Sequence, residues 1–407
     1  MILSSLLRAI IREGTLIVID HKGARREYGN GQEPRIAIHL ADKSVERGII
    51  ASPELGVAEA YMDGKLTIEE GDLYGFLALA SGNMYRHADH WLLKLQERIA
   101  RWTRWLAQFN PVSRSKKNVA HHYDLSDTLY DLFLDEGRQY SCAYFAKPDY
   151  TLEEAQVAKK NHIASKLLLK EGLKILDIGC GWGGMAMHLN EVSGAETVGI
   201  TLSEEQLKYA EDNAARSGLA NQVQFRLQDY RDVTEKFDRV VSVGMFEHVG
   251  TPFYQTFFDK VAEVLTDDGV GLVHTIGRYD GPGATDSFTR KYIFPGGYAP
   301  ALSEIMPRIE SAGLVVTDIE ILRLHYASTL REWRRRFMKN RDKVQEIYDE
   351  RFCRMWEFYL AGSECAFRYG GHCVFQIQVA RDQQAVPLTR DYMAEWEKRL
   401  DQRAAAE

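Results

Sequence analysis

The segment Asp177-Ile-Gly-Cys-Gly-Trp-Gly-Gly184 follows a short apolar stretch and leads into a helical pattern over residues 183–192. Glycines in a turn between a strand and a helix let the backbone approach a ligand closely. Gly179, Gly181 and Gly184 also have the G-x-G-x-x-G spacing found at dinucleotide sites. This segment therefore predicts a nucleotide-containing ligand where the first strand of a sheet ends.

Two details separate this turn from a site for NAD. Asp177 ends the strand at a point where a carboxylate suits a cationic ligand better than a pyrophosphate. The second predicted strand ends in Thr201-Leu-Ser203, without the acidic residue that usually binds the ribose of NAD. The pattern favours S-adenosylmethionine, a nucleoside that carries a cationic amino-acid arm. NAD and a purely structural glycine turn are the alternatives.

Alternating strand and helix patterns surround this segment. The predicted strands are 174–178, 196–201, 223–227, 237–243 and 269–276, and the predicted helices are 183–192, 203–216 and 253–265. Ser203 suits the N-cap of the second helix, because Gln206 follows at capping-box spacing. Strands separated by helices of this length predict an α/β fold with a parallel, doubly wound sheet, and ligands of such sheets bind at the carboxyl ends of the strands.

The N-terminal region predicts a small α+β domain. It contains an amphipathic helix over 1–12, β structure over 14–50 with strands at 15–19 and 35–40, and helices over 55–62 and 72–80. A basic segment with several tryptophans, residues 86–117, follows. We place the domain boundary near Asn110, which gives a small domain with a basic linker helix (1–109) and a sheet domain (110–407).

The C-terminal part of the chain departs from the strand–helix alternation. Residues 278–300 are rich in glycine, proline and aromatic residues, which predicts a lid-like loop. Residues 329–360 predict one long helix with a basic first half, and residues 373–380 predict a last strand.

Composition excludes several classes of protein. A net charge of -7 argues against a whole-surface nucleic-acid binder. The five cysteines form no CxxC pair, which argues against a disulfide framework or a cysteine-rich zinc site and predicts a reduced, cytosolic protein. No apolar run approaches the ~18 residues of a membrane-spanning helix, and the N-terminus lacks the features of a secretory signal.

Five segments together resemble the cyclopropane fatty acyl phospholipid synthase family, which includes the mycolic acid cyclopropane synthases. The glycine-rich segment is similar to the methyltransferase loop of this family. The others are His121-His-Tyr-Asp-Leu-Ser126, Tyr140-Ser-Cys-Ala-Tyr-Phe145, Ile200-Thr-Leu-Ser-Glu-Glu-Gln206 and Met245-Phe-Glu-His-Val249, which occur in the order of the family. The resemblance covers about three quarters of the chain, and the first hundred residues resemble the N-terminal domain of the bacterial phospholipid enzymes loosely.

The resemblance implies an activity. Family members transfer a methylene group from S-adenosylmethionine to the cis double bond of unsaturated fatty acyl chains in membrane phospholipids. Methyl transfer to an alkene leaves a carbocation, which closes to a cyclopropane once the new methyl group loses a proton to a bound bicarbonate. The resemblance also implies a class I methyltransferase fold with a helical lipid-facing cover, a homodimer built through the small domain, and a cytoplasmic enzyme that is peripheral at the inner face of the membrane.

The resemblance further implies which residues form the site. The bicarbonate would be held by Cys142 and Ile276 through backbone groups, and by Glu247, His274 and Tyr326 through side chains. The cofactor would be held, with Asp177, by Tyr140, Ser141, Gly179, Gly181, Thr201, Gln206, Gln228, Asp229 and Tyr230. No metal site is expected. Ser363 stands where many family members have cysteine, which argues against an essential cysteine nucleophile there, and we interpret His248 as structural.

Two basic segments suggest contact with an anionic bilayer. Residues 86–117 and 323–343 each contain eight basic and two acidic residues. Such segments can bind anionic lipid surfaces, with more weight on 323–343 because it includes Tyr326. Changing Arg334, Arg335 and Arg336 to Glu would test this. The alternative is that both segments are ordinary solvated helix faces, or that one pairs with acidic residues of the small domain.

Three other functions are alternatives. A family member could form a methyl-branched or hydroxylated acyl chain from the same cation. A small-molecule N-methyltransferase could share the fold, although an amine substrate yields no carbocation and needs no set like Glu247, His274 and Tyr326. A lipid-binding module with a vestigial cofactor site is a rival from another class, against which the intact glycine loop and Asp177 argue.

Overall fold

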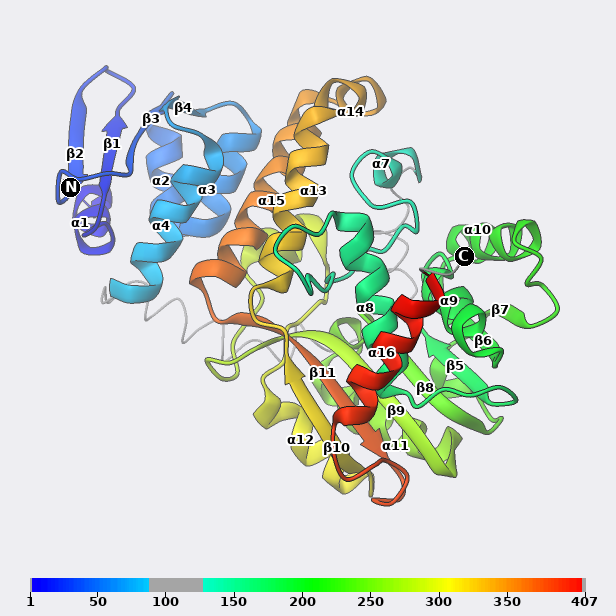
Figure 1. Cartoon of the computed structure of the whole chain (residues 1–407). Helices are drawn as coiled ribbons and strands as arrows, with labels where there is room; N and C mark the ends of the chain where they lie inside the picture. Colours follow the sequence, from blue (N-terminus) through cyan, green and yellow to red (C-terminus); the bar gives the residue numbers. More distant parts are fainter. Residues whose placement is uncertain (1, 88–126, 405–407) are drawn as a thin grey trace. The chain divides into compact units, whose positions relative to one another are not determined.

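The structure is a computed structural model that describes residues 2–87 and 127–404 (Figure 1). The chain divides into two compact units. The first contains Met1–Arg104, Ala284–Pro295 and Ala327–His372, and the second contains Trp105–Gly283, Gly296–Tyr326 and Cys373–Glu407. The predicted boundary near Asn110, the basic segment 88–117 and the motif 121–126 lie outside the described residues.

The first unit combines a four-stranded sheet with helices. Its elements are α1 (Ile2–Ile10), β1 (Thr15–Ile19), β2 (Arg25–Gly29), β3 (Arg35–Leu40), α2 (Lys43–Ala51), α3 (Pro53–Met62), β4 (Leu66–Glu70), α4 (Leu73–His87), the π-helix η4 (Thr289–Ile293), α14 (Arg341–Ile347), α15 (Glu350–Tyr369) and most of α13 (His325–Lys339). The strand order is β2-β1-β3-β4. The N-terminal helix and the strands at 15–19 and 35–40 are confirmed.

Part of the predicted β structure is helical instead. Residues 43–51 form α2 because Asp42 caps them, with its carboxylate accepting hydrogen bonds from the backbone N–H groups of Ser44 and Val45. The sequence analysis placed residues 284–295 and 327–372 with the sheet domain, but they belong to the first unit, where α15 packs against α3 and α4. Within the segment predicted as a lid, Lys291 and Tyr292 both bind the carboxylate of Glu59.

The prediction of one long helix over 329–360 is wrong, because three helices cover this region. α13 ends at Lys339, α14 spans Arg341–Ile347, and α15 begins at Glu350. Tyr348 has non-helical backbone angles (φ -121°, ψ -132°), which end α14, and Asp349 starts a new helix by accepting a hydrogen bond from Phe352 N at 2.7 Å. An aspartate at an N-cap satisfies donors that the helix itself leaves free.

The second unit is built around a seven-stranded sheet with the order β10-β11-β9-β8-β5-β6-β7. Its elements are α7 (Asp127–Asp131), α8 (Leu152–Lys166), β5 (Lys174–Ile178), α9 (Gly184–Ser193), β6 (Glu196–Thr201), α10 (Glu204–Arg216), β7 (Val223–Leu227), η1 (Tyr230–Asp232), β8 (Phe237–Val243), η2 (Phe246–His248), η3 (Thr251–Phe253), α11 (Tyr254–Val264), β9 (Leu265–Arg278), α12 (Leu302–Ser311), β10 (Val315–Ile321), β11 (His372–Ala380) and α16 (Asp391–Ala404). β5 to β9 pair in parallel, and β10 and β11 pair antiparallel. The predicted α/β fold is confirmed.

Apolar side chains on both faces of the sheet form the core of this unit. α8, α9 and α16 pack on one face through residues such as Ile163 and Met185, and α11 and α12 pack on the other through residues such as Phe257 and Ile305 (Figure 1). Helices on both faces make this a doubly wound sheet, and the carboxyl ends of its parallel strands therefore meet at one edge.

Capping at α10 differs in detail from the predicted capping box. The hydroxyl of Ser203 accepts a hydrogen bond from Gln206 N at 3.3 Å, so Ser203 is the N-cap. The side chain of Gln206, however, accepts a hydrogen bond from the Thr201 hydroxyl at 2.9 Å. This ties the start of α10 to the end of β6.

All five cysteines are buried free thiols. Over residues 2–87 and 127–404, no helix combines the length and apolar character that crossing a bilayer requires. The same residues contain no group of three or more His, Cys, Asp or Glu side chains able to hold a metal ion.

Candidate active site

A pocket opens where the parallel strands β5, β6 and β8 end. All ten residues that the sequence analysis assigned to the cofactor line it, namely Tyr140, Ser141, Asp177, Gly179, Gly181, Thr201, Gln206, Gln228, Asp229 and Tyr230. These residues come from segments up to 90 positions apart, and the sheet brings them together because parallel strands end at the same edge.

The glycine loop forms the floor of this pocket. Gly179 and Gly181 have φ of +82° and +56°, a region that favours glycine. A Cβ atom at Gly181 would meet nothing within 4 Å, whereas one at Gly179 would lie 2.7 Å from Cβ of Met245. Gly181 therefore leaves open volume to a ligand, and Gly179 allows close packing against the loop after β8.

Asp177 presents an unsatisfied carboxylate at the pocket. Its side chain is buried, and its Oδ2 atom has no hydrogen-bond partner among the described residues. Burial raises its pKa to about 7, against the opposing effect of Lys159. A buried carboxylate oxygen without a partner is costly, so this position suits a cationic donor. The ammonium-bearing arm of S-adenosylmethionine has that chemistry, and the residues of the pocket fit this cofactor.

Lys159 holds the loop that contains Gln139 and Ser141, two residues that line the pocket. This lysine lies on α8 and is fully buried, and its ammonium group donates hydrogen bonds to Gln139 Oε1 at 2.7 Å and Ser141 Oγ at 2.9 Å. Gln156 binds the carbonyls of the same two residues. Burial lowers the pKa of Lys159 to about 7. The sequence analysis missed Lys159, because a lysine in a Lys-Lys pair on a helix is usually exposed.

Polar side chains fix the far end of the pocket. The hydroxyl of Thr201 donates to the carbonyl oxygen of Gln206, which leaves the amide NH₂ of Gln206 as its donating end. The carboxylate of Asp229 forms two hydrogen bonds with the guanidinium of Arg231, at 2.8 and 2.7 Å. This ion pair ties together the turn after β7.

Glu247 and Ile276, two of the five residues assigned to the bicarbonate, are in direct contact. The backbone N–H of Ile276 donates to Glu247 Oε1 at 2.6 Å. The other oxygen, Oε2, is buried and has no hydrogen-bond partner among the described residues, and burial raises the pKa of Glu247 to about 7. Glu247 thus keeps one acceptor free for an O–H group of a ligand.

The other three residues of that set, Cys142, His274 and Tyr326, are buried in the same unit. The thiol of Cys142 donates to the carbonyl of Ala143 at 3.3 Å, so it is engaged locally. Nδ1 of His274 lies 3.2 Å from the side-chain nitrogen of Gln376, and burial holds the pKa of His274 well below its usual value. The histidine is therefore neutral.

A stack of three rings holds the loop that contains Cys142. Tyr144 lies between His162 and His325, with ring centroids 4.3 and 4.8 Å away and rings nearly parallel. The backbone N–H of Phe145 donates to His325 Nδ1 at 2.9 Å. This stack connects the Cys142 loop with the residue just before Tyr326, and the sequence analysis missed it because no local pattern marks stacked rings from distant segments.

Two further residues bear on the sequence analysis. His248, interpreted as structural, lines the pocket, and burial lowers its pKa to about 4, so it is an uncharged polar group there. In α15, Cys365 is buried and its pKa is raised to about 12, mainly by burial. A thiol with so high a pKa is a poor nucleophile, which supports the expectation that no cysteine nucleophile acts near Ser363.

This fold and pocket define a class I S-adenosylmethionine-dependent methyltransferase. The chain belongs to the mycolic acid cyclopropane synthetase family, since the sequence model of that family matches residues 111–377. This confirms the resemblance found in the sequence. A second model, described as a domain of unknown function (DUF7884), matches residues 12–89.

Individual relatives agree with the family. The chain is 36% identical over 354 residues to the cyclopropane-fatty-acyl-phospholipid synthase of Escherichia coli K12, covering 86% of this chain and 89% of that one. It is 41% identical over 287 residues to a probable fatty acid methyltransferase of Pseudomonas putida, covering 68% and 73%. Among solved structures, the mycolic acid cyclopropane synthase CmaA1 complexed with SAH and CTAB has a TM-score of 0.63 and 34% identity, covering 67% of this chain and 99% of that one.

The substitution Gly181→Val tests the floor of the pocket. We expect it to abolish binding of S-adenosylmethionine in calorimetry, because the branched side chain would enter open ligand volume. Gly218→Val is the matched control, since Gly218 also has a left-handed φ (+72°) and open space around a Cβ, but lies outside the pocket. Undiminished binding by Gly181→Val would remove this loop from the cofactor site.

Asp177 predicts a pH dependence of cofactor affinity. As the pH falls through about 7, Asp177 becomes neutral and Lys159 becomes charged, and both changes disfavour a cationic ligand. We expect the dissociation constant for S-adenosylmethionine to rise below that point, with each of the two groups contributing at most about tenfold per pH unit. Asp177→Asn should bind more weakly and with a flatter pH profile. An unchanged slope in Asp177→Asn would assign the titration to another group.

Proposed function

We propose that this protein transfers a methylene group from S-adenosylmethionine to the cis double bond of unsaturated fatty acyl chains in membrane phospholipids, forming cyclopropane chains, with bound bicarbonate as the base. The single observation that carries the proposal is the unsatisfied Oε2 atom of Glu247, buried behind the pocket-lining turn at the end of β8. Methylation of an amine forms no carbocation, so an amine methyltransferase has no proton to remove from the transferred methyl group and needs no anion bound beside its cofactor pocket.

The chemistry of an alkene explains why such a group is needed. The alkene is a neutral nucleophile and requires no activation, so methyl transfer, for which the bound cofactor supplies the methyl group, leaves a carbocation on the acyl chain. The new methyl group must then lose a proton before the ring closes. A small base beside that methyl group and a site that excludes water are the two requirements.

The residues of the site can meet the first requirement. Bicarbonate carries one O–H group, which can donate to the free Oε2 of Glu247, while the opposite oxygen of Glu247 is held by the N–H of Ile276. The remaining oxygens of the anion need donors, and His274, Tyr326 and the backbone N–H of Cys142 are donors of the right kind. In this arrangement the carboxylate orders the anion and receives its proton.

The composition of total lipids tests the reaction directly. We expect expression in a host without the activity to add one CH₂ to the mass of monounsaturated acyl chains, and the product to resist hydrogenation as a cyclopropane does. A product that hydrogenates, or one that also carries an oxygen atom, would replace ring closure by the methyl-branched or hydroxylated outcome. Unchanged lipids together with methylation of an added amine would support a small-molecule N-methyltransferase.

The substitution Glu247→Gln distinguishes a role of Glu247 in binding the base from a role in binding the cofactor. We expect turnover to fall by about a hundredfold or more, because the amide loses the carboxylate that orders bicarbonate. The affinity for S-adenosylmethionine should change little, and calorimetry provides that control. Added bicarbonate should accelerate the wild type, so a bicarbonate-depleted wild type that works at full rate would contradict the bound-ion mechanism.

We further propose that an exposed face of α13 contacts an anionic bilayer. Arg331, Arg335 and Lys339 recur every four residues on one exposed face, with exposed Met338 beside them. The opposite side of α13 is buried through Leu330, Trp333 and Phe337, so this helix has one basic face and one core face. Each basic residue near an anionic surface contributes about 1 kcal/mol of binding.

The structure changes the choice of variants for this test. Arg334 was among the three arginines selected from the sequence, but its guanidinium binds the buried Glu364 at 3.1 Å and lies over the ring of Tyr74. Changing Arg334 to Glu would place two carboxylates together inside the first unit. A loss of lipid binding by such a variant would therefore report loss of structure.

The triple variant Arg331→Glu, Arg335→Glu, Lys339→Glu should bind anionic vesicles more weakly in co-sedimentation. Binding to zwitterionic vesicles should change little, and high salt should weaken binding of the wild type, because the Debye length falls to ~3 Å at 1 M salt. A control with the same charge change, Lys22→Glu, Arg25→Glu, Arg26→Glu, alters exposed residues around the β1–β2 turn. Equal binding of the α13 variant and the wild type would remove this face from the membrane contact.

Assembly as a homodimer through the small domain, and a location at the inner face of the membrane, complete the proposal. Both come from the family resemblance. Sedimentation of the purified chain would measure its oligomeric state.

A further inference from the structure

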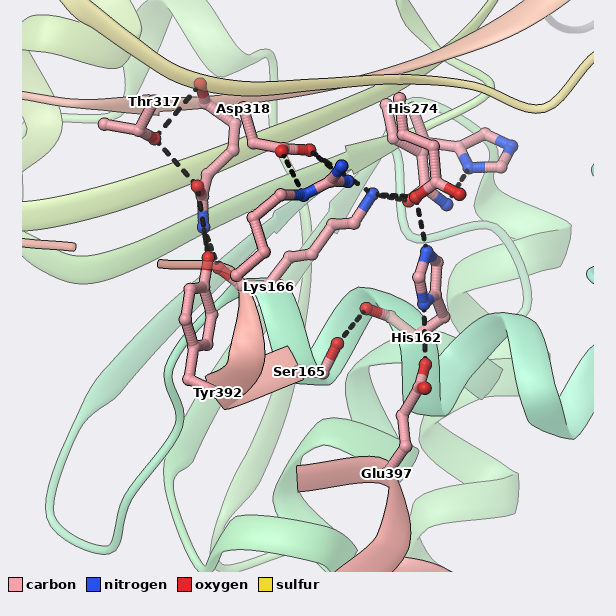
Figure 2. A network of polar contacts seen from close by, with 12 residues as sticks. His162, Ser165, Lys166, His274, Thr317, Asp318, Tyr392 and Glu397 are labelled. Atoms are coloured by element: carbon pink, nitrogen blue, oxygen red, sulfur yellow. Dashed lines mark hydrogen bonds and ion pairs between the residues drawn. The ribbon is translucent and has the colours of Figure 1, made fainter. Parts of the chain in front are cut away.

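A chain of buried polar contacts leads from α8 to His274 (Figure 2). The ammonium group of Lys166 donates to Gln376 Oε1 at 2.7 Å, and the amide nitrogen of Gln376 lies 3.2 Å from Nδ1 of His274. Lys166 and Gln376 are fully buried and His274 is 2% exposed. Water therefore does not compete for these contacts.

The direction of each hydrogen bond in this chain follows from Lys166. An ammonium group has donors and no acceptor, so the oxygen of the Gln376 amide must face Lys166. The NH₂ group of the same amide must then face His274 and donate to Nδ1. In a neutral imidazole one nitrogen accepts and the other carries the hydrogen. His274 therefore carries its hydrogen on Nε2.

Acidic groups surround the buried side-chain nitrogen of Lys166. Glu320 accepts from the Lys166 ammonium at 2.5 Å, and Asp318 lies 3.8 Å away. Glu320 is itself held by His162, whose other ring nitrogen binds Glu397, each at 2.6 Å (Figure 2). Asp318 also pairs with Arg390 at 2.8 Å. Burial lowers the pKa of Lys166, and the two carboxylates oppose that shift.

We propose that Lys166, acting through Gln376, is a positioning device that fixes His274 as a neutral Nε2–H donor. The imidazole then has no free lone pair, because Nδ1 is occupied by Gln376 and Nε2 carries hydrogen. His274 binds and orients an anion by donating to it, and it does not itself accept the proton from the substrate. The identity of that anion as bicarbonate rests on the proposed function, while the tautomer of His274 does not.

The electrostatic surroundings of His274 support the neutral state. Burial is the main cause that holds the pKa of His274 well below its usual value. Lys159, Lys166 and His162 also disfavour a positive charge on the ring, and Glu320 acts in the opposite direction. A neutral donor keeps its role over the physiological pH range.

Nitrogen NMR of protein labelled with ¹⁵N-histidine tests the inference without any assay of activity. The two tautomers have distinct nitrogen shifts, and the signals of His274 are those that disappear in His274→Asn. We expect the wild type to show the Nε2–H form without titration near neutral pH. In Gln376→Glu, the carboxylate offers no hydrogen to Nδ1, so the hydrogen should move to Nδ1.

Gln378→Glu is the matched control. Gln378 lies on the same strand and donates to the Lys166 carbonyl and the Tyr392 hydroxyl, but in the structure it binds neither end of the His274 ring. This variant should keep the Nε2–H form. A wild type with the Nδ1–H form, or with a ring that titrates near neutral pH, would overturn the inference, as would an unchanged tautomer in a folded Gln376→Glu.

Kinetics connect the tautomer with the reaction. Gln376→Glu should raise the half-saturating bicarbonate concentration by about tenfold or more, and the affinity for S-adenosylmethionine should stay within about twofold. If the wild type shows the Nε2–H form but does not depend on bicarbonate, the bound-ion mechanism fails and the positioning of His274 stands. If Gln376→Glu switches the tautomer but leaves the bicarbonate requirement unchanged, the role of His274 as donor to the base is wrong.

Discussion

Two lysines that lie on α8 and are completely buried organise the second unit. Lys159 and Lys166 are both 0% exposed, and a spacing of seven residues places them on one face of the helix, two turns apart. A buried ammonium group is costly unless partners replace its water. The fold must therefore bring polar groups to two fixed points along α8, and it does so from the loop at 139–142 and from the strands β10 and β11.

The polar partners of the two lysines belong to two parts of the candidate site. These parts are the cofactor pocket and the residues assigned to the bicarbonate. Lys159 holds Gln139 and Ser141, so the backbone that leads to Cys142 is fixed beside the cofactor pocket. Lys166 holds Gln376, and through it the ring of His274. One helix thus sets the position of both the cofactor loop and a residue assigned to the base. Methyl transfer followed by proton removal from the same carbon requires the cofactor and the base to be held close to each other.

Most of the pocket could be predicted from the sequence, because its parts follow local patterns. The strands β5 to β8 are short and alternate with helices along the chain, and all ten predicted cofactor residues line one pocket. The buried lysines could not be predicted, because helix position alone does not distinguish a buried lysine from a solvated one. The breaks between α13, α14 and α15 were missed for a related reason, since helical periodicity continues across Asn340 and Tyr348 and the cap at Asp349 is visible in the geometry.

Lys166 acts on His274 through Gln376, and this arrangement affects the basicity of an anion bound beside His274. An ammonium group in direct contact with an anion stabilises its charged form and lowers its basicity. Here the positive charge acts through the amide of Gln376 on a neutral imidazole, so the anion would receive a hydrogen bond without a direct ion pair. Glu247, with its pKa raised to about 7 by burial, can then share the proton that the anion gains. Such a site would bind an anion and still let it remove a proton from carbon. A direct contact between lysine and the anion would strengthen binding but lower the basicity of the anion.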